Sequence, residues 1–404
     1  MKIYLDQNVW DAAIERLEFL FDEFKNVIVC CSGGKDSTIT LELALIVARK
    51  KKRLPLPVYF LDQEAEWESV VDYMREIMSR DEVKPLWIQV PIFLPNSLSQ
   101  EEPYLVTWEE GREWMRPKED ISIKDNHELK GKAEKEAKRG YWYNYFVKSI
   151  DILYPDEPAV FLAGMRAEEA PQRLTALTSG ATYKHITWGK ELNKRKKHYN
   201  FYPLFDWSVS DVWKAIHDNN WNYCNIYNEY FRYGLPVKDM RVSNLHHETA
   251  VKCLHYLHEL EGHTWDKLTR RLKGINQAKH IEKTELIRVN TLPYMFKDWK
   301  EYRDFLTEKL IIDEKQREYF KVEWKKHDKL YDMLRNPKEL YKEQIKSILV
   351  NDNEFARIES YLQRPYLVVY RDWKKGRTLR NPPDSIYNKQ IKEQFLKRLV
   401  KLLE

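Results

Sequence analysis

The segment from Val27 to Thr38 constrains this chain most, because it joins a short apolar run to the only pair of adjacent glycines in the sequence. Val27 to Cys31 have the length and composition of a buried strand, and Thr38 to Ala48 have those of a helix. Between them, Gly33-Gly34 lets the backbone approach an anion closely and point successive N–H groups at it. Because the positive end of a helix dipole follows, the segment predicts a phosphate-binding loop.

Side chains of the loop add to the predicted anion site. Its serine and threonine hydroxyls can donate hydrogen bonds, and Lys35 provides a positive charge. The loop differs from the common kinase-type phosphate loop, which has Ser or Thr directly after its lysine, where this chain has Asp36. The residues predicted to contact a nucleotide here are Ser32, Gly33, Gly34, Lys35, Asp36, Ser37 and Thr38.

Length and composition indicate a cytoplasmic protein of two domains. The chain has 404 residues, more than one hydrophobic core usually organises. It is 43% hydrophobic and 13% aromatic, which argues against disorder, and no apolar run is long enough to cross a membrane. The first residues lack the apolar segment of a secretory signal. A net charge of +5 is too small to predict nucleic-acid binding by itself.

A second strand pattern, Leu56 to Leu61, ends at the carboxylate of Asp62. Open α/β sheets bind ligands at the carboxyl ends of their strands, so Asp62 is predicted to lie near a bound nucleoside. Asp36, Asp62 and Glu64 are candidate oxygen ligands for Mg²⁺ beside the phosphates, and Glu66 could help to hold the ion. Glu64 and Glu66 have a second interpretation, as acids at the solvated start of a helix, where they favour its dipole.

The loop sequence Ser-Gly-Gly-Lys-Asp-Ser resembles the pyrophosphate loop (PP-loop) of the ATP pyrophosphatase superfamily. That superfamily includes phosphoadenosine phosphosulfate (PAPS) reductases, ATP sulfurylase small subunits and tRNA thiolation enzymes. Two further segments are similar to PAPS reductases. Residues Gly164 to Arg173 match their Gly-x-Arg-x-x-Glu-Ser-x-x-Arg element, with Ala170 in place of the serine. Residues Tyr202 to Trp213 match their Pro-Leu-x-Asp-Trp-Ser-x-x-Asp-Val-Trp segment.

The resemblance implies a fold, a ligand and catalytic residues. Residues 1–235 are expected to form an α/β domain with a mostly parallel sheet and helices on both faces, the adenine nucleotide alpha-hydrolase-like fold, and residues 236–404 a smaller, mainly helical domain. The ligand is expected to be ATP or PAPS, with Gly164 and Arg166 beside it. Arginine suits this place because its planar guanidinium group binds phosphate or sulfate through two hydrogen bonds. The candidate catalytic residues are Lys35, Asp36, Arg166 and Arg173.

The cysteines depart from the reductase pattern. Reductases of this superfamily use a cysteine in a C-terminal segment, and some of their relatives bind an iron–sulfur cluster through cysteines. This chain has four, Cys30, Cys31, Cys224 and Cys253, and none lies in either pattern. Thiol-dependent reduction of PAPS is therefore doubtful and an iron–sulfur cluster is not expected, whereas the nucleotide-binding part of the resemblance stands.

Most of the chain, including Met240 to Asn244 and the helical extension after it, is similar to the immunoglobulin-binding regulator A family. Those are bacterial and prophage-borne PAPS-reductase-like proteins, encoded beside a ParB-like partner and described as regulators of gene expression. The resemblance implies a ParB-like partner and a role in transcription regulation. Basic and aromatic residues near the end, such as Trp373, Lys374 and Arg377, suit either DNA contact or an ordinary solvated surface.

The sequence leaves two functions open. In the first, the protein is an enzyme that acts at the α-phosphate of ATP, as a PP-loop nucleotide alpha-hydrolase or adenylyl transferase. In the second, it is a non-catalytic ATP or PAPS sensor that acts with a ParB-like partner. A measurement of turnover separates the two functions. Only the enzyme forms a product, and its product formation is lost when Asp36 is replaced by alanine.

Overall fold

The computed structural model describes residues 5–96, 102, 104–124, 141–169, 171–178, 181–193, 197–242, 244–247, 250–275, 289, 291–328, 337–349 and 355. The chain forms two compact units, and neither is continuous in sequence. The first consists of Met1–Leu94, Val106–Leu245 and Tyr256–Arg271. The second consists of Pro95–Leu105, His246–His255 and Leu272–Glu404. The C-terminal residues considered for DNA contact, Trp373, Lys374 and Arg377, lie outside the described residues.

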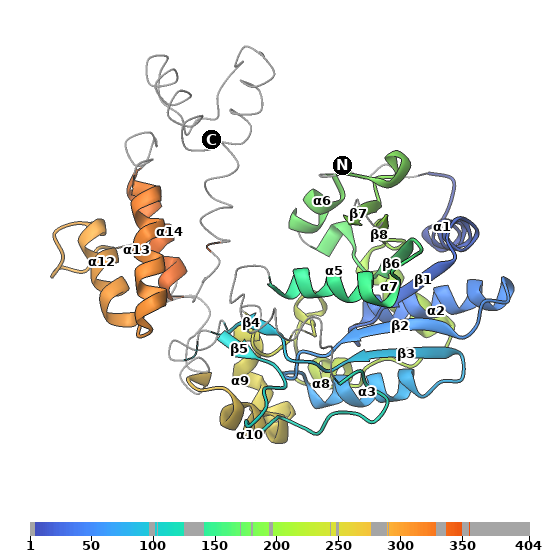
Figure 1. Cartoon of the computed structure of the whole chain (residues 1–404), viewed down its shortest axis with the longest axis horizontal. Coiled ribbons are helices and arrows are strands. Elements are labelled where there is room, and N and C mark those ends of the chain that lie inside the picture. The colour runs from blue at the N-terminus through green and yellow to red at the C-terminus, as the bar shows by residue number, and fades with distance from the viewer. Residues whose placement is uncertain are drawn as a thin grey trace, which may run out of the picture. The chain divides into compact units, whose positions relative to one another are not determined.

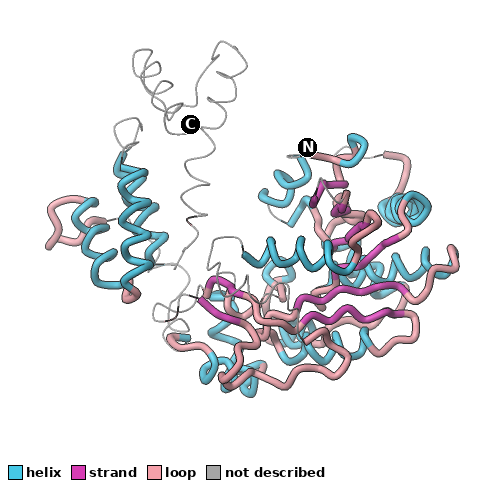
Figure 2. Tube along the Cα trace, viewed as in Figure 1, coloured by secondary structure: helices cyan, strands magenta, loops and turns pink. Residues whose placement is uncertain are grey.

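A six-stranded sheet forms the centre of the first unit (Figure 2). Neighbouring strands pair in parallel except at one edge, where the last strand runs antiparallel to its neighbour. The expected mostly parallel sheet is therefore confirmed. In their order across the sheet, the strands are β3 (Val83–Ile88), β2 (Leu56–Leu61), β1 (Asn26–Cys30), β6 (Ala159–Ala163), β8 (His198–Phe201) and the antiparallel β7 (Gly189–Asn193). A separate two-stranded sheet is made of β4 (Phe93–Pro95) and β5 (Tyr104–Val106).

Helices cover both faces of the sheet (Figure 1). On one face, Tyr145 and Ile150 of α5 (Tyr141–Leu153) pack in a core with Ile28 and Phe161 of the central strands. Successive strand residues point to opposite faces, so Val27 and Val29 are left to pack against the other helix layer. That layer is formed by α1 (Val9–Glu23), α2 (Lys35–Lys50) and α3 (Glu68–Met78).

The strand order places a topological switch point between β1 and β6. The chain runs outward from β1 to β2 and β3, and then returns to β6 on the other side of β1. Cys30 at the end of β1 pairs with Ala163 at the end of β6, so the two strands stop at the same level. Connections that leave such a pair diverge to opposite sides, and ligands of open α/β sheets bind in the crevice between them.

The first unit also contains shorter helices after β6. A 3₁₀ turn and α6 follow β6 directly, and α7 follows β8. These helices are η1 (Ala167–Glu169), α6 (Pro171–Thr178), η2 (Tyr183–His185), α7 (Val209–Asp218), α8 (Ile226–Arg232), η3 (Val237–Asp239), α9 (Val251–Leu260) and α10 (Gly262–Arg271). Of α9, only the C-terminal part belongs to the first unit, whereas α10 belongs to it entirely.

The segment Tyr202 to Trp213 has a structural role. Ser208 forms a capping box with Asp211 at the start of α7. The guanidinium group of Arg16 on α1 donates to Asp206, at 2.8 and 2.6 Å, and Trp207 Nε1 donates to the Val9 carbonyl at 3.0 Å. The segment therefore fastens α1 to the connection between β8 and α7.

The N-terminus of α3 is capped by a residue that lies far away in the sequence. Trp67 occupies the N-cap position and offers no side-chain acceptor. Instead, the Glu261 carboxylate accepts the N–H groups of Glu68 and Ser69 at 2.9 and 3.1 Å. Lys267 adds an ion pair to Glu68 at 3.0 Å. An acid at a helix N-terminus is favoured both by these hydrogen bonds and by the helix dipole.

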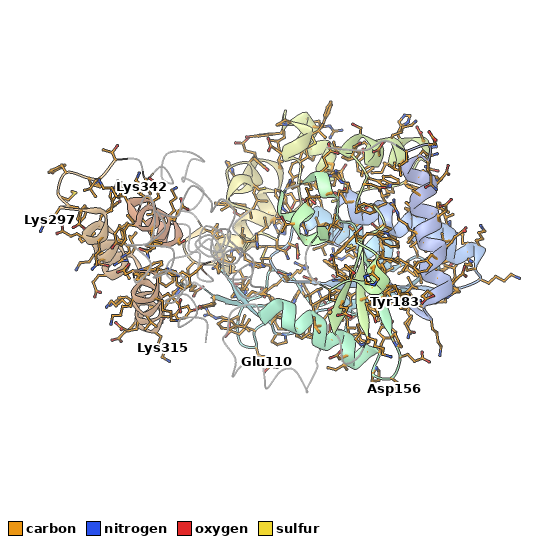
Figure 3. The ribbon with its side chains drawn as sticks, turned by 90° about the horizontal axis from the view of Figure 1, so that it is seen from above. Glu110, Asp156, Tyr183, Lys297, Lys315 and Lys342 are labelled. Carbon is orange, nitrogen blue, oxygen red and sulfur yellow. The ribbon has the colours of Figure 1, made fainter. Side chains whose placement is uncertain are left out.

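The second unit contains a bundle of α12 (Trp299–Leu310), α13 (Glu314–Asp328) and α14 (Pro337–Leu349). Trp324, Phe320 and Ile345 are among the residues of its core. A buried Arg303 donates to Asp328 at 2.6 Å and to Gln344 at 2.8 Å, so its charge is compensated inside the bundle. Figure 3 labels three lysines of this unit, Lys297, Lys315 and Lys342.

Within the described residues, none of the helices combines the length and the apolar composition that a membrane-spanning helix needs.

Candidate phosphate-binding site

The loop between β1 and α2 has the sharp turn that its glycines predict. Gly33 adopts a φ of +71°, a conformation that residues with a side chain rarely take. A Cβ atom at Gly33 would also lie 2.8 Å from Val70 Cγ1 of α3. Gly34 then serves as the N-cap of α2, and its own backbone is extended. The loop therefore needs glycine at position 33 for both conformation and space.

Two of the three loop hydroxyls hold the loop itself rather than facing outward. Ser37 Oγ donates to the Gly34 carbonyl at 2.8 Å and lies 3.3 Å from the Ser32 N–H. Thr38 is fully buried, and its hydroxyl donates to the same Gly34 carbonyl at 3.1 Å. Of the three hydroxyl-bearing residues of the loop, only Ser32 is exposed. For Thr38, this packing opposes the expected contact with a nucleotide.

Gly164 brings the connection after β6 against the start of α2. A Cβ atom at Gly164 would lie 2.5 Å from the carbonyl carbon and oxygen of Asp36 and 2.7 Å from the Ser37 nitrogen. These are backbone atoms, which cannot rotate away. The backbone contact places the two connections of the switch point side by side, so the glycine of the second motif shapes the same site as the glycines of the first.

Two buried cations share one carboxylate beside the start of α2. Asp36 Oδ2 lies 3.1 Å from Lys35 Nζ, and its Oδ1 accepts a hydrogen bond from Arg166 Nε. Lys35 and Arg166 are 6% and 4% exposed, so both positive charges are largely removed from water. The three side chains carry a net charge of +1. A buried excess of positive charge is stabilised by an anion, and the helix N-terminus adds to the same field.

Arg173 lies apart from this cluster. It is on the exposed side of α6, with Nε 3.6 Å from Glu169 Oε2, and about half of its side chain is exposed. Arg241 reaches the same glutamate, 3.6 Å from Oε1, and donates to the Glu169 carbonyl at 3.0 Å. Of the two arginines predicted to act in catalysis, the structure brings Arg166 to the loop and leaves Arg173 in a surface ion-pair group.

Asp62, expected from the sequence to lie beside a nucleoside and a metal ion, is hydrogen-bonded by groups of the protein itself. It is fully buried. Its oxygens accept hydrogen bonds from Trp87 Nε1 at 2.9 Å, Gln89 Nε2 at 2.8 Å, Arg116 Nη2 at 2.5 Å and the Glu64 N–H at 3.0 Å. These donors satisfy the carboxylate inside the protein, so it joins the end of β2 to its neighbours.

Glu64 has the same kind of role. It is fully buried, with a φ of +66°, and accepts from Arg271 Nε at 2.6 Å and from the backbone of Trp108 and Met115 at 2.6 and 3.3 Å. Among the described residues, no group of three His, Cys, Asp or Glu side chains is arranged to hold a metal ion. Protein donors engage Glu64 and Asp62, and two cations engage Asp36, so the role of these acids as Mg²⁺ ligands stays a prediction.

Glu66, in the connection between β2 and α3, is buried close to Asp62. Asn244 Nδ2 donates to Glu66 Oε1 at 2.7 Å. Burial, together with the negative charge of Asp62, raises the pKa of Glu66 to about 8 from an ordinary 4.5. Its carboxyl group therefore keeps its proton at neutral pH, which excludes the solvated helix start considered from the sequence.

We expect Glu66→Gln to remove a pH dependence of stability. Between pH 4.5 and about 8 the folded chain holds a proton that the unfolded chain releases, so the free energy of unfolding falls as the pH rises through this window. The variant carries no ionisable group there and keeps an acceptor for Asn244. Urea unfolding at pH 5 and pH 9 should show the variant gaining stability relative to the wild type by several kcal/mol, on the order of 1.4 kcal/mol per pKa unit.

The matched control is Glu113→Gln, which changes an exposed glutamate of the same unit. It should leave the difference between the two pH values as in the wild type. Parallel pH profiles of the wild type and Glu66→Gln would contradict the raised pKa.

Tyr227 belongs to the site and is missed by the motifs. It lies on α8, is 3% exposed, and its hydroxyl oxygen accepts the Lys35 N–H at 3.0 Å. Lys35 Nζ lies 5.6 Å from the centre of its ring. The sequence gives no signal for this contact, because a tyrosine in an aromatic-rich segment is most simply assigned to packing.

Comparison with protein families gives one decisive match. Residues 26–233 match the phosphoadenosine phosphosulfate reductase domain, over half of the chain. The chain belongs to this family. It is thus a PP-loop nucleotide-binding protein with the expected adenine nucleotide alpha-hydrolase-like fold. Residues 234–370 match a second family, a domain of unknown function, DUF3440.

Individual relatives of this PAPS reductase family member are distant. The uncharacterized protein YbdN of Escherichia coli strain K12 is 28% identical over 287 residues, which cover 69% of this chain and 68% of YbdN. Among solved structures, FMN adenylyltransferase of Candida glabrata is 14% identical with a TM-score of 0.36, over 61% of this chain and 66% of that chain, just under two thirds. PAPS reductase of Candida auris is 14% identical with a TM-score of 0.30, over 61% of this chain and 99% of that chain.

Two of the four cysteines of this PAPS reductase family member are placed for packing. Cys31 and Cys224 are buried, and their sulfur atoms contact Ser37 Oγ at 3.7 Å and the Ser69 carbonyl at 3.4 Å. Burial raises the pKa of Cys31, and it raises that of Cys224 to about 12. Because the thiolate is the nucleophilic form, neither is prepared for nucleophilic attack at neutral pH.

Proposed function

We propose that this protein binds ATP through residues Ser32 to Ser37 and acts at its α-phosphate, without a reductase cysteine. The observation that carries the proposal is the pair of buried cations, Lys35 and Arg166, at the N-terminus of α2 and at the switch point of the sheet. Their excess positive charge suits a polyphosphate. Tests with PAPS are equally warranted, since the same charges suit its phosphate and sulfate groups.

The proposed reaction is a transfer of the adenylyl group. An acceptor oxygen, from water or a second substrate, bonds to the α-phosphorus and releases any proton that it carries to solvent, and the bond from that phosphorus to the bridging oxygen of pyrophosphate breaks. Pyrophosphate leaves with the electron pair, and no electrons pass to or from a cofactor. Lys35 and Arg166 neutralise the charge that develops on the phosphates, and Asp36 holds both cations in position.

A second function, a nucleotide sensor without turnover, is favoured by one observation. Asp62 and Glu64, the acids expected to serve a metal ion, are used by protein donors. In this proposal the chain has the regulatory role described for the immunoglobulin-binding regulator A family. Residues 1–235 bind ATP or PAPS in the cytoplasm, and residues 236–404, expected from the sequence to be mainly helical, contact a ParB-like partner or DNA to regulate transcription.

We expect Lys35→Ala to lower product formation about 100-fold, because it removes a charge that acts on the phosphates in the transition state. The assay incubates the full chain with ATP or PAPS in magnesium-containing buffer, with and without duplex DNA, and separates the products by chromatography. AMP and pyrophosphate from ATP would support the transfer reaction. The same assay with Asp36→Ala tests whether the carboxylate that holds both cations is required.

The control is Lys315→Ala, which changes an exposed lysine near the start of α13 (Figure 3). Its position in that helix is similar to that of Lys35 at the start of α2. It should retain wild-type turnover. Intact ATP and PAPS under every condition, with binding that Lys35→Ala weakens, would favour the sensor. Sulfite and adenosine bisphosphate from PAPS would contradict the inference drawn from the cysteines.

A further inference from the structure

The hydroxyl of Tyr227 lies directly on the phosphate loop. Its oxygen is 3.0 Å from the Lys35 nitrogen and 3.6 Å from the place of a Cβ atom on Gly34. The Lys35 N–H is among the first of α2, the group that a helix N-terminus offers to an anion. Tyr227 therefore stands where the loop meets a bound phosphate.

The hydrogen bond to Lys35 leaves the Tyr227 proton unused. The phenol oxygen accepts in that bond, and none of the described residues accepts the Tyr227 O–H in return. Burial raises the pKa of the phenol, so it keeps its proton at neutral pH. Tyr227 as a whole is 3% exposed, and a buried donor that lacks an acceptor among the described residues costs free energy. An anionic oxygen beside it would remove that cost.

We propose that Tyr227 is a ligand-contacting residue of the phosphate site and donates its hydroxyl proton to a terminal phosphate oxygen of the bound nucleotide. The Lys35 N–H polarises the phenol, which strengthens its donation to the phosphate. The ligand class is a molecule with a pyrophosphate or triphosphate group. This inference rests on the nucleotide binding proposed above and adds a residue from α8 to a site otherwise built by the connections after β1 and β6.

The same contact would also be compatible with a Tyr227 hydroxyl that blocks phosphate binding, and the two roles predict opposite effects of removing it. If the Tyr227 hydroxyl occupied the anion position and had to leave before a phosphate could bind, its removal would strengthen binding. If it donates to the phosphate, removal weakens binding. Tyr227→Phe deletes the hydroxyl and keeps the ring that packs 5.3 Å from Trp213, so it separates the two roles by the sign of its effect.

The test is isothermal titration of the full chain with ATP, inorganic pyrophosphate and AMP. Tyr227→Phe is expected to weaken the binding of ATP and of pyrophosphate about tenfold, the loss of one hydrogen bond to a charged group. AMP, which lacks the terminal phosphates, should bind the variant and the wild type alike. Tyr223→Phe is the matched control, since its hydroxyl donates to Asn228 Oδ1 at 2.7 Å within the same region.

The outcomes distinguish this inference from the proposed function. Wild-type binding of ATP together with unchanged or tighter binding by Tyr227→Phe overturns the role of Tyr227 alone. An equal loss of ATP, pyrophosphate and AMP binding also overturns it, because the effect then does not come from the terminal phosphates. Failure of the wild type to bind any of the three ligands overturns the proposed function and the inference with it.

Discussion

Replacing Gly164 by alanine is expected to lower the free energy of unfolding by roughly 3 kcal/mol and to weaken nucleotide binding at least about tenfold. The added Cβ atom would lie 2.5 Å from the backbone of Asp36 and 2.7 Å from that of Ser37. Since those atoms start α2, relief of the contact has to move the helix or the connection after β6. Either movement separates Arg166 from Asp36 and opens the phosphate loop.

The matched control for Gly164→Ala is Gly262→Ala. A Cβ atom at Gly262 meets nothing within 4 Å, and this residue starts α10 in the same unit. Alanine there should leave the urea midpoint and the binding of ATP close to those of the wild type. Equal stability of Gly164→Ala and the wild type would show that the two connections do not need their backbone contact.

Replacing Arg271 by methionine is expected to cost about 3–5 kcal/mol of stability, because it leaves the Glu64 carboxylate buried without its cation. Glu64 is fully buried and Arg271 is 8% exposed, with Nε 2.6 Å from Glu64 Oε1. The two backbone N–H groups on Glu64 remain, but they do not neutralise its charge. Urea unfolding followed by circular dichroism measures the loss.

Arg270→Met separates the ion pair from a general effect on α10. Arg270 is the neighbouring residue and is exposed, so its replacement should change stability by less than about 0.5 kcal/mol. The single variant Glu64→Gln and the double variant Glu64→Gln with Arg271→Met complete a double-mutant cycle, which isolates the interaction energy between the two side chains. A loss for Arg271→Met no larger than that for Arg270→Met would rule out the buried pair.

The phosphate loop and the parallel sheet are predictable from the sequence because each is encoded locally. The apolar run Val27 to Val29 specifies a buried strand, and the glycines after it specify a turn, whatever the rest of the chain does. Gly164 and Arg166 are found through a motif of ten residues. Their meeting with Asp36 then follows from the strand order, in which β6 lies beside β1.

The sequence is least informative where long-range packing decides the role of a side chain. Asp62 and Glu64 occupy the position at which α/β sheets present ligand-binding acids, so the pattern favours a metal site. Their actual partners include Arg116 and Arg271, which are 54 and 207 residues away in the chain. Tyr227 is 192 residues from the Lys35 N–H that it accepts. No local pattern connects such pairs.

The capping of α3 by Glu261 bears on how this architecture is inherited. The PAPS reductase family match ends at residue 233, whereas Glu261 and Arg271 lie in the second family match and complete the first unit. A gene that lost the second segment would encode a nucleotide domain with an exposed helix end and an unneutralised acid in its core. The two segments are therefore expected to be retained together, and recombination between unrelated genes is expected to join them at positions after residue 271.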